Sequence, residues 1–292
     1  MCGCSDVPAS RTGDSSASAG NLSQPQASSS VGTGWDSIAG PVVIVPGSKN
    51  SVNTAIVLPS LTDSTLASAL HLDLRKLDGI GVDLFDLNGL IGHSILQVVM
   101  QSGDSTGCIA WPVGMFQGAV PAGWRVALES GRALGISLES PEHLSIADSA
   151  QFIADILGAV SSLKGSTDQT FRGIPFSVRM AYRLRTGSPS IIIAETVRKI
   201  NEEANPREEH ILLVAERSAR DSTYRVAFHT RSAGTEESLE TSEVLAALRF
   251  ARTGRLAIFI TFDYEDGGKI GLLERVTDNT WQAVWKSAYA GC

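Results

Sequence analysis

Short apolar runs separated by turn residues are the feature that most limits what this 292-residue chain can fold into. Runs such as "VVIV", "TAIVL", "ILQVVM" and "CIAWPV" have the length of strands, and Gly, Pro, Ser and Asp separate them. The longest runs, such as "PVVIV", "SIIIA" and "LAIFITF", are far shorter than the roughly 20 apolar residues of a membrane-spanning helix. We therefore expect a mainly β protein of the α+β class with antiparallel sheets.

The distribution of charge divides the chain into three parts. Residues 1–34 carry one Arg and two Asp, residues 35–164 carry six basic and twelve acidic residues, and residues 165–292 carry seventeen of each. The Ser-rich and Gly-rich stretch over 5–34 cannot bury enough apolar surface to offset backbone ordering, which costs roughly 1–2 kcal/mol per residue. We predict a disordered tether over 1–34, an acidic β-rich domain over 35–164 and a second β-rich domain over 165–292.

About one amphipathic helix is expected in each domain. In the first domain, Ser145 is suited to cap a helix that runs to Leu163, and Asp148 places a negative charge in its first turn. Apolar residues recur at helical spacing along this segment: Ile146, Ile153, Ile156, Leu157 and Val160.

In the second domain, the segment "TSEVLAALRFARTG" begins with Thr241 as a cap and ends at Gly254 as a stop. Its apolar residues Val244, Leu245 and Leu248 would share one helical face.

The rest of the second domain is expected to be an antiparallel meander. Four long strand candidates over 174–234 alternate charged with apolar residues, so we expect one packed face and one solvated face laced by cross-strand ion pairs. A hairpin with its turn at 266–268 follows, and a last strand contains Trp281 and Trp285, four positions apart. The two indoles are expected on one face, where they cover the core; a ligand-stacking platform is the alternative.

The first four residues, Met1-Cys2-Gly3-Cys4, resemble the end of a bacterial lipoprotein signal, in which Gly or Ala precedes an acylated Cys. The resemblance implies that Cys4, or alternatively Cys2, carries lipid, with the hydrophobic part of the signal lying upstream. It implies an extracytoplasmic, periplasmic location and a membrane tether. The alternative is that both residues are incidental cysteines in a cytoplasmic tail.

Two further cysteines, Cys108 and Cys292, form a candidate disulfide if the compartment is oxidising. Closing so long a loop would contribute about 4–5 kcal/mol in the chain-entropy model. Free buried thiols are the alternative.

Residues suited to nucleophilic catalysis are not arranged in a recognisable motif. The loop around Asp104, Ser105 and Thr106 lacks the G-x-S-x-G arrangement of a hydrolase elbow. The five histidines lie without motif context: His71, His93, His143, His210 and His229. We predict no catalytic residues, and a polar turn explains the loop.

Two acidic segments contain the oxygen ligands that calcium prefers. One contains Asp73, Asp78, Asp83, Asp86, Asn88 and Gly89, and the other contains Asp263, Glu265 and Asp266. Neither has the spacing of an EF-hand, and the chain has no CxxC or HExxH zinc pattern, so we interpret both as solvated turns and predict no metal site.

The composition argues against nucleic acid as a partner, because the net charge is −7 and the isoelectric point is about 5.3. The sequence "DGIGVD" lacks the third glycine of a dinucleotide-binding loop, and neither a Walker A motif nor a haem-attachment motif occurs, so no cofactor is expected.

These observations favour a non-catalytic, membrane-tethered subunit that binds an integral membrane protein complex. In layout alone, the chain resembles the membrane-extrinsic accessory subunits of bacterial photosynthetic reaction-centre and antenna complexes. The alternative function is an extracytoplasmic hydrolase or ligand-binding lipoprotein whose pocket the sequence does not reveal.

Overall fold

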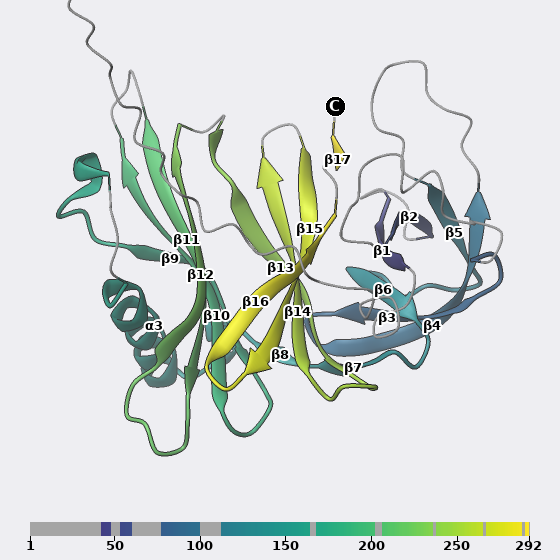
Figure 1. Ribbon diagram of the computed structural model, residues 1–292, viewed down its shortest axis with the longest axis horizontal. Helices are drawn as coiled ribbons and strands as arrows, with labels where there is room; N and C mark the ends of the chain where they lie inside the picture. The colour runs from purple at the N-terminus through teal and green to yellow at the C-terminus, as the bar shows by residue number, and fades with distance from the viewer. Residues whose placement is uncertain are drawn as a thin grey trace, which may run out of the picture. The chain divides into compact units, whose positions relative to one another are not determined.

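The computed structural model describes residues 42–47, 53–59, 77–99, 112–163, 168–201, 206–235, 238–264, 267–287 and 290–291. These residues belong to one compact unit and form a closed β-barrel, two antiparallel sheets and one α-helix (Figure 1). The mainly β, antiparallel fold expected from the sequence is confirmed. Across the described ranges, no helix is both long enough and apolar enough to cross a membrane.

The barrel has the strand order β1-β2-β5-β4-β3-β6, and pairing of Ile44 with Ala127 closes it. Its strands are β1 (Val42–Pro46), β2 (Thr54–Pro59), β3 (Gly81–Asp86), β4 (Gly89–Val99), β5 (Val113–Gln117) and β6 (Val126–Glu129). Its interior is filled by side chains that include Leu84, Leu96 and Phe116. The barrel is therefore a packed core of its own.

The two sheets contain the remaining strands. The first sheet has the order β12-β11-β10-β9-β8, with β8 (Leu138–Glu139), β9 (Ser177–Leu184), β10 (Ser190–Ile200), β11 (Arg207–Arg217) and β12 (Arg225–Gly234). The second has the order β16-β15-β14-β13-β7, with β7 (Ala133–Ile136), β13 (Thr241–Phe250), β14 (Leu256–Tyr264), β15 (Gly267–Thr277) and β16 (Thr280–Lys286); β17 (Ala290–Gly291) also pairs with β15. The predicted meander is confirmed as β9 to β12, and the predicted hairpin as β14 and β15. The turn predicted at 266–268 is misplaced, because Gly267 and Gly268 belong to β15 and pair with Tyr264 and Asp263.

The helix, the first sheet, the second sheet and the barrel pack on one another in that order as four layers (Figure 1). The helix α3 (Ile146–Ser161) covers the outer face of the β8–β12 sheet. The inner face of that sheet packs on the second sheet, where Ile193 and Val214 meet Ile258 and Phe262. The other face of the second sheet packs on the barrel. Both sheets are thus buried on both faces at their centres, which explains continuous apolar runs such as "SIIIA".

The helix α3 forms as predicted. Ser145 is its N-cap, and the Ser145 Oγ accepts the Asp148 N–H at 3.2 Å. Two short 3-10 helices flank it, Pro141–His143 (η2) and Gln169–Phe171 (η3). The domain boundary predicted near residue 164 follows α3 in the sequence, yet α3 packs on the β8–β12 sheet, most of which lies after that boundary. Strands β7 and β8 also precede the boundary, and they pair with β13 and β9, which follow it.

The second predicted helix is wrong, because Thr241–Phe250 is strand β13. Val244 packs between the sheets, whereas Leu245 and Leu248 face the barrel. A strand buried on both faces is apolar at almost every position, so its pattern also satisfies helical spacing.

Two further expectations about faces are wrong. The meander has no solvated face at its centre, because α3 covers one face and the second sheet covers the other. Trp281 and Trp285 lie on opposite faces, since the register of β15 with β16 shifts between Leu272 and Leu273. Both indoles are buried, so their role in covering the core is confirmed.

Candidate functional site

A cavity of about 450 Å³ lies beside strand β9, next to the end of β8. Its lining includes residues 178–182 of β9 together with Arg125, Glu142 and Glu243. We call this cavity the β9 groove. It brings together the edge of one sheet, the segment after β8 and the neighbouring strand β13 of the other sheet.

The edge of β9 is open because β8 is short. Only Leu138 and Glu139 pair with it, opposite Leu184 and Arg183. If that register continued by two residues, Pro141 would stand opposite Ala181, and proline has no N–H to donate. The chain instead turns into η2 at Pro141. Within the described ranges, residues 177–182 of β9 therefore have a strand partner only on the β10 side.

The direction of the β9 backbone groups follows from the ladder. The Arg185 N–H donates to the Ser137 carbonyl at 3.2 Å, across the edge that β8 occupies. In an antiparallel ladder, alternate residues direct their N–H and C=O groups to the same neighbour. The backbone groups of Arg183 and Ala181 therefore point to this edge as well, and those of Ala181 point into the β9 groove.

The opposite wall is β13, whose edge is already occupied by side chains. Strand β7 pairs with β13 only at residues 247–250. In the part of β13 that precedes residue 247, Arg125 Nη1 donates to the Val244 carbonyl at 3.1 Å, and Arg179 Nη2 donates to the Ser242 carbonyl. The Ser242 N–H donates to Glu195 Oε2 at 2.9 Å. The groove thus has one free backbone edge and one capped edge.

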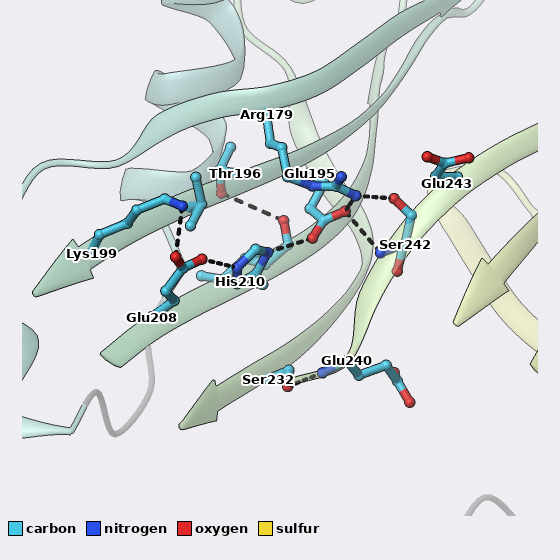
Figure 2. Close-up of polar contacts among 12 residues, drawn as sticks. Arg179, Glu195, Thr196, Lys199, Glu208, His210, Ser232, Glu240, Ser242 and Glu243 are labelled. Atoms are coloured by element: carbon cyan, nitrogen blue, oxygen red, sulfur yellow. Dashed lines mark hydrogen bonds and ion pairs between the residues drawn. The ribbon is translucent and has the colours of Figure 1, made fainter. Parts of the chain in front are cut away.

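A chain of alternating charges begins at Arg179, which lines the groove, and Figure 2 shows its contacts. Arg179 contacts Glu195, whose Oε1 lies 2.6 Å from His210 Nδ1. His210 Nε2 lies 2.7 Å from Glu208 Oε2, and Lys199 Nζ donates to Glu208 Oε1 at 2.6 Å. Glu195 and His210 are buried, while Glu208 and Lys199 lead outward to solvent. Because both ring nitrogens face carboxylates, the imidazole is placed to be a cation that donates twice.

The pKa values of this chain follow from its contacts. Burial opposes the charge on His210, but the hydrogen bonds to Glu195 and Glu208 outweigh it, so the His210 pKa is raised. Burial would raise the pKa of Glu195, yet the bonds from His210, Arg179 and the Ser242 N–H hold it below its usual value. Each shift favours the charged form of its group, so the two groups stabilise each other's charge.

Two other buried glutamates are satisfied in the same way. Glu209 contacts Arg198 and accepts a bond from Arg231 at 3.1 Å. Glu216 accepts two bonds from Arg275, at 2.7 and 2.8 Å, and one from Trp281 Nε1 at 2.6 Å. The cross-strand ion pairs expected for the meander are therefore present, but several are buried rather than solvated.

The predicted acidic segments are engaged in local hydrogen bonds where the structure describes them. Asp83 accepts bonds from Ser130 Oγ at 2.8 Å and the Gly131 N–H at 2.8 Å, and it lies 2.7 Å from His93 Nδ1. Asp86 caps the turn at Asn88, and Thr261 donates to Asp263 at 2.7 Å. Over the described ranges, no group of three or more His, Cys, Asp or Glu is placed to hold a metal ion.

Several other predicted residues fall outside the described ranges. These are Cys2, Cys4, Asp73, His71, Asp104, Ser105, Thr106, Cys108, Glu265, Asp266 and Cys292. The lipid on Cys4 or Cys2 and the disulfide between Cys108 and Cys292 therefore stay predictions. Of the other histidines, His143 lies on η2, and burial lowers the pKa of His229 on β12.

The groove and its charge chain were not singled out by the sequence analysis. A usable signal was present, because Glu195 interrupts "SIIIAETV" and His210 directly precedes "ILLVA". Ionisable residues within or beside runs buried on both faces require buried partners. What the sequence did not supply was the identity of those partners.

Comparisons with protein-family models, with curated proteins and with solved structures found no match. The chemistry of the site therefore rests on its geometry. The β9 groove offers backbone donors and acceptors along one wall, and arginine and glutamate side chains on the others. These groups suit an extended polypeptide, whose own backbone can pair with β9.

Proposed function

We propose that this protein is a non-catalytic, extracytoplasmic subunit that binds an integral membrane protein complex by adding a strand of its partner to β9. The observation that supports strand addition is the open β9 edge in a groove of about 450 Å³, whereas the location and the kind of partner rest on the resemblances of the sequence. A partner strand would continue the β8–β12 sheet where Pro141 ends β8. Main-chain hydrogen bonds would supply affinity, and the charged walls would select the partner sequence.

The same proposal includes a membrane tether through an acylated Cys4 or Cys2. It rests on the resemblance of the first four residues to a lipoprotein signal, and tethering raises the effective concentration of the groove at the membrane. The mass of the N-terminal peptide from native membranes tests it, since acyl chains add a defined mass to one cysteine. An unmodified peptide from a protein in the soluble fraction would refute the tether while leaving the groove to be tested separately.

Site-specific crosslinking tests the groove in the full chain. A photo-reactive amino acid in place of exposed Glu142 or Glu243 should crosslink to one and the same partner polypeptide in native membranes. The same group in place of exposed Arg220, in the loop after β11, should not reach that polypeptide. Crosslinked reaction-centre or antenna polypeptides would support the layout resemblance. Equal crosslinking from all three positions would contradict a role for the groove.

A backbone variant tests strand addition itself. Ala181→Pro removes the N–H that points into the groove, and an edge strand tolerates proline at such a position. We expect it to abolish the Glu142 crosslink while the thermal unfolding midpoint shows that the fold is kept. Amide exchange of the unsubstituted protein is an independent measurement, because partner binding should protect the Ala181 N–H. An Ala181 N–H that exchanges equally fast with and without bound partner would rule out pairing to β9.

A further inference from the structure

A second cavity, of about 310 Å³, lies where three loops converge at one end of the two sheets. Arg249 at the end of β13, Arg255 in the turn before β14 and Arg275 near the end of β15 all line it. Thr186 and Ser188 line it from the loop between β9 and β10. We call this cavity the arginine pocket. Its volume is at the lower end of the range for small-molecule sites, about 300–1,000 Å³.

The turn between β13 and β14 places two of these arginines together. Gly254 has a φ of 69°, a conformation that glycine adopts readily, and its N–H donates to the Phe250 carbonyl at 2.8 Å. The Phe250 N–H in turn donates to the Arg255 carbonyl at 3.0 Å. This tight turn brings Arg255 back beside Arg249, with both side chains lining the same cavity.

The charges of the three arginines are not equally compensated. Arg275 is bound by Glu216, and Arg255 Nη1 donates to Glu274 Oε1 at 2.9 Å. Arg249 instead donates through Nη1 to the Gly254 carbonyl at 3.0 Å, and it forms no ion pair among the described residues. A guanidinium carries five N–H donors, so both Arg249 and Arg255 keep donors for a ligand.

Among the residues that the structure describes, one carboxylate lines the pocket. Asp278 is 90 % exposed, and it accepts a bond from Arg275 Nη2 at 2.9 Å. The buried Glu216 and Glu274 do not line the cavity, but they contact Arg275 and Arg255, which do. The charged side chains that line the cavity are three arginines and one aspartate, and Arg249 is the arginine among them that no carboxylate of the described residues contacts. The Thr186 hydroxyl already donates to the Pro189 carbonyl at 3.1 Å, so the hydroxyl donors that a tetrahedral oxyanion can use come from Ser188 and Thr253.

We propose that the arginine pocket binds a phosphate group. Guanidinium groups match the geometry of phosphate oxygens and bind them through paired N–H···O bonds, and the exposed Asp278 occupies part of that donor set when the pocket is empty. The phosphate belongs either to a free phosphate compound or to a phospholipid headgroup, since both present the same oxygens. This inference is independent of the β9 groove, which lies on other residues.

Calorimetric titration of the full chain with inorganic phosphate, at constant ionic strength, tests the proposal. We expect saturable binding that Arg249→Gln weakens about tenfold, because a charge-assisted bond is lost. Arg249 is the informative position, since its contact is a surface turn carbonyl and its loss leaves no buried carboxylate unpaired. Asp278→Asn should tighten binding by removing the competing carboxylate.

The matched control is Arg225→Gln. Arg225 is an exposed arginine at the same end of the sheets, paired with Asp221, and it does not line the pocket. It should leave phosphate binding unchanged although the net charge changes equally. Absence of saturable binding, or equal weakening by Arg249→Gln and Arg225→Gln, would overturn the proposal.

Vesicle binding distinguishes the two sources of phosphate. Vesicles of phosphatidylcholine with phosphatidic acid should bind the protein if the ligand is a headgroup, and both Arg249→Gln and soluble phosphate should release it. Saturable binding of inorganic phosphate without vesicle binding would assign the pocket to a free phosphate compound. Vesicle binding that neither Arg249→Gln nor soluble phosphate reduces, in a protein that binds no inorganic phosphate, would overturn the site.

Discussion

Replacing Glu195 with alanine should destabilise the folded protein by about 4 kcal/mol, which is a large fraction of the 5–15 kcal/mol typical of a domain. Three contacts are lost. The buried Ser242 N–H loses its acceptor, which costs about 1–3 kcal/mol, and the charge-assisted bond to His210 contributes about 1.5–3 kcal/mol. Arg179 is 34 % exposed, so water replaces much of its contact and its share is below about 1 kcal/mol.

Urea unfolding followed by tryptophan fluorescence and far-ultraviolet circular dichroism measures this loss. The matched control is Glu243→Ala, an exposed glutamate on the same side of the groove, which should change the free energy of unfolding by less than about 0.5 kcal/mol. A double-mutant cycle with His210→Ala isolates the pair, and the coupling should exceed about 1 kcal/mol. Equal losses for Glu195→Ala and Glu243→Ala would refute the buried charge chain.

Three further predictions concern pH, backbone contact and a buried indole. The His210 pKa is raised in the folded protein, so its contribution to the free energy of unfolding is full below the unfolded pKa of 6.5 and is lost as pH rises through the folded pKa. The free energy of unfolding of His210→Ala, measured against pH, should lack this decline. Gly135→Ala should cost about 1–3 kcal/mol, because its Cβ would lie 2.3 Å from the Leu90 nitrogen, whereas Gly158→Ala in α3 meets nothing within 4 Å and should stabilise by about 0.5–1 kcal/mol in thermal unfolding. Trp281→Phe removes the indole bond to Glu216 and should cost about 1–2 kcal/mol in the same assay, with no loss expected if that bond is absent in solution.

The elements that could be predicted from the sequence are those whose signals are local. The cap at Ser145 and the acidic first turn identified α3, and runs of β-branched residues identified β10. The misassigned segment 241–250 shows the limit, because burial on both faces removes the alternation that distinguishes a strand. The layers that cover those faces are distant in sequence, so no local pattern reveals them.

The candidate site depends on pairing register, which explains why it was not predicted. Glu195 and His210 are 15 positions apart and meet because β10 pairs with β11 with Thr196 opposite Ile211. A shift of one residue would move Glu195 to the face covered by α3. The prediction that Trp281 and Trp285 share one face failed for the same reason, since one register shift in the pairing of β15 with β16 places them on opposite faces.

The charge chain and the open edge are physically linked through Arg179. Glu195 orients the guanidinium of Arg179, and that guanidinium occupies the Ser242 carbonyl on β13. Because Glu195 also accepts the Ser242 N–H, both backbone groups of Ser242 are unavailable to a partner strand. At the β9 edge, where Pro141 ends β8, no side chain of the described residues caps Ala181 in this way. A strand entering the groove can therefore pair with β9 but not with β13, so the buried ion pairs determine which sheet a partner extends.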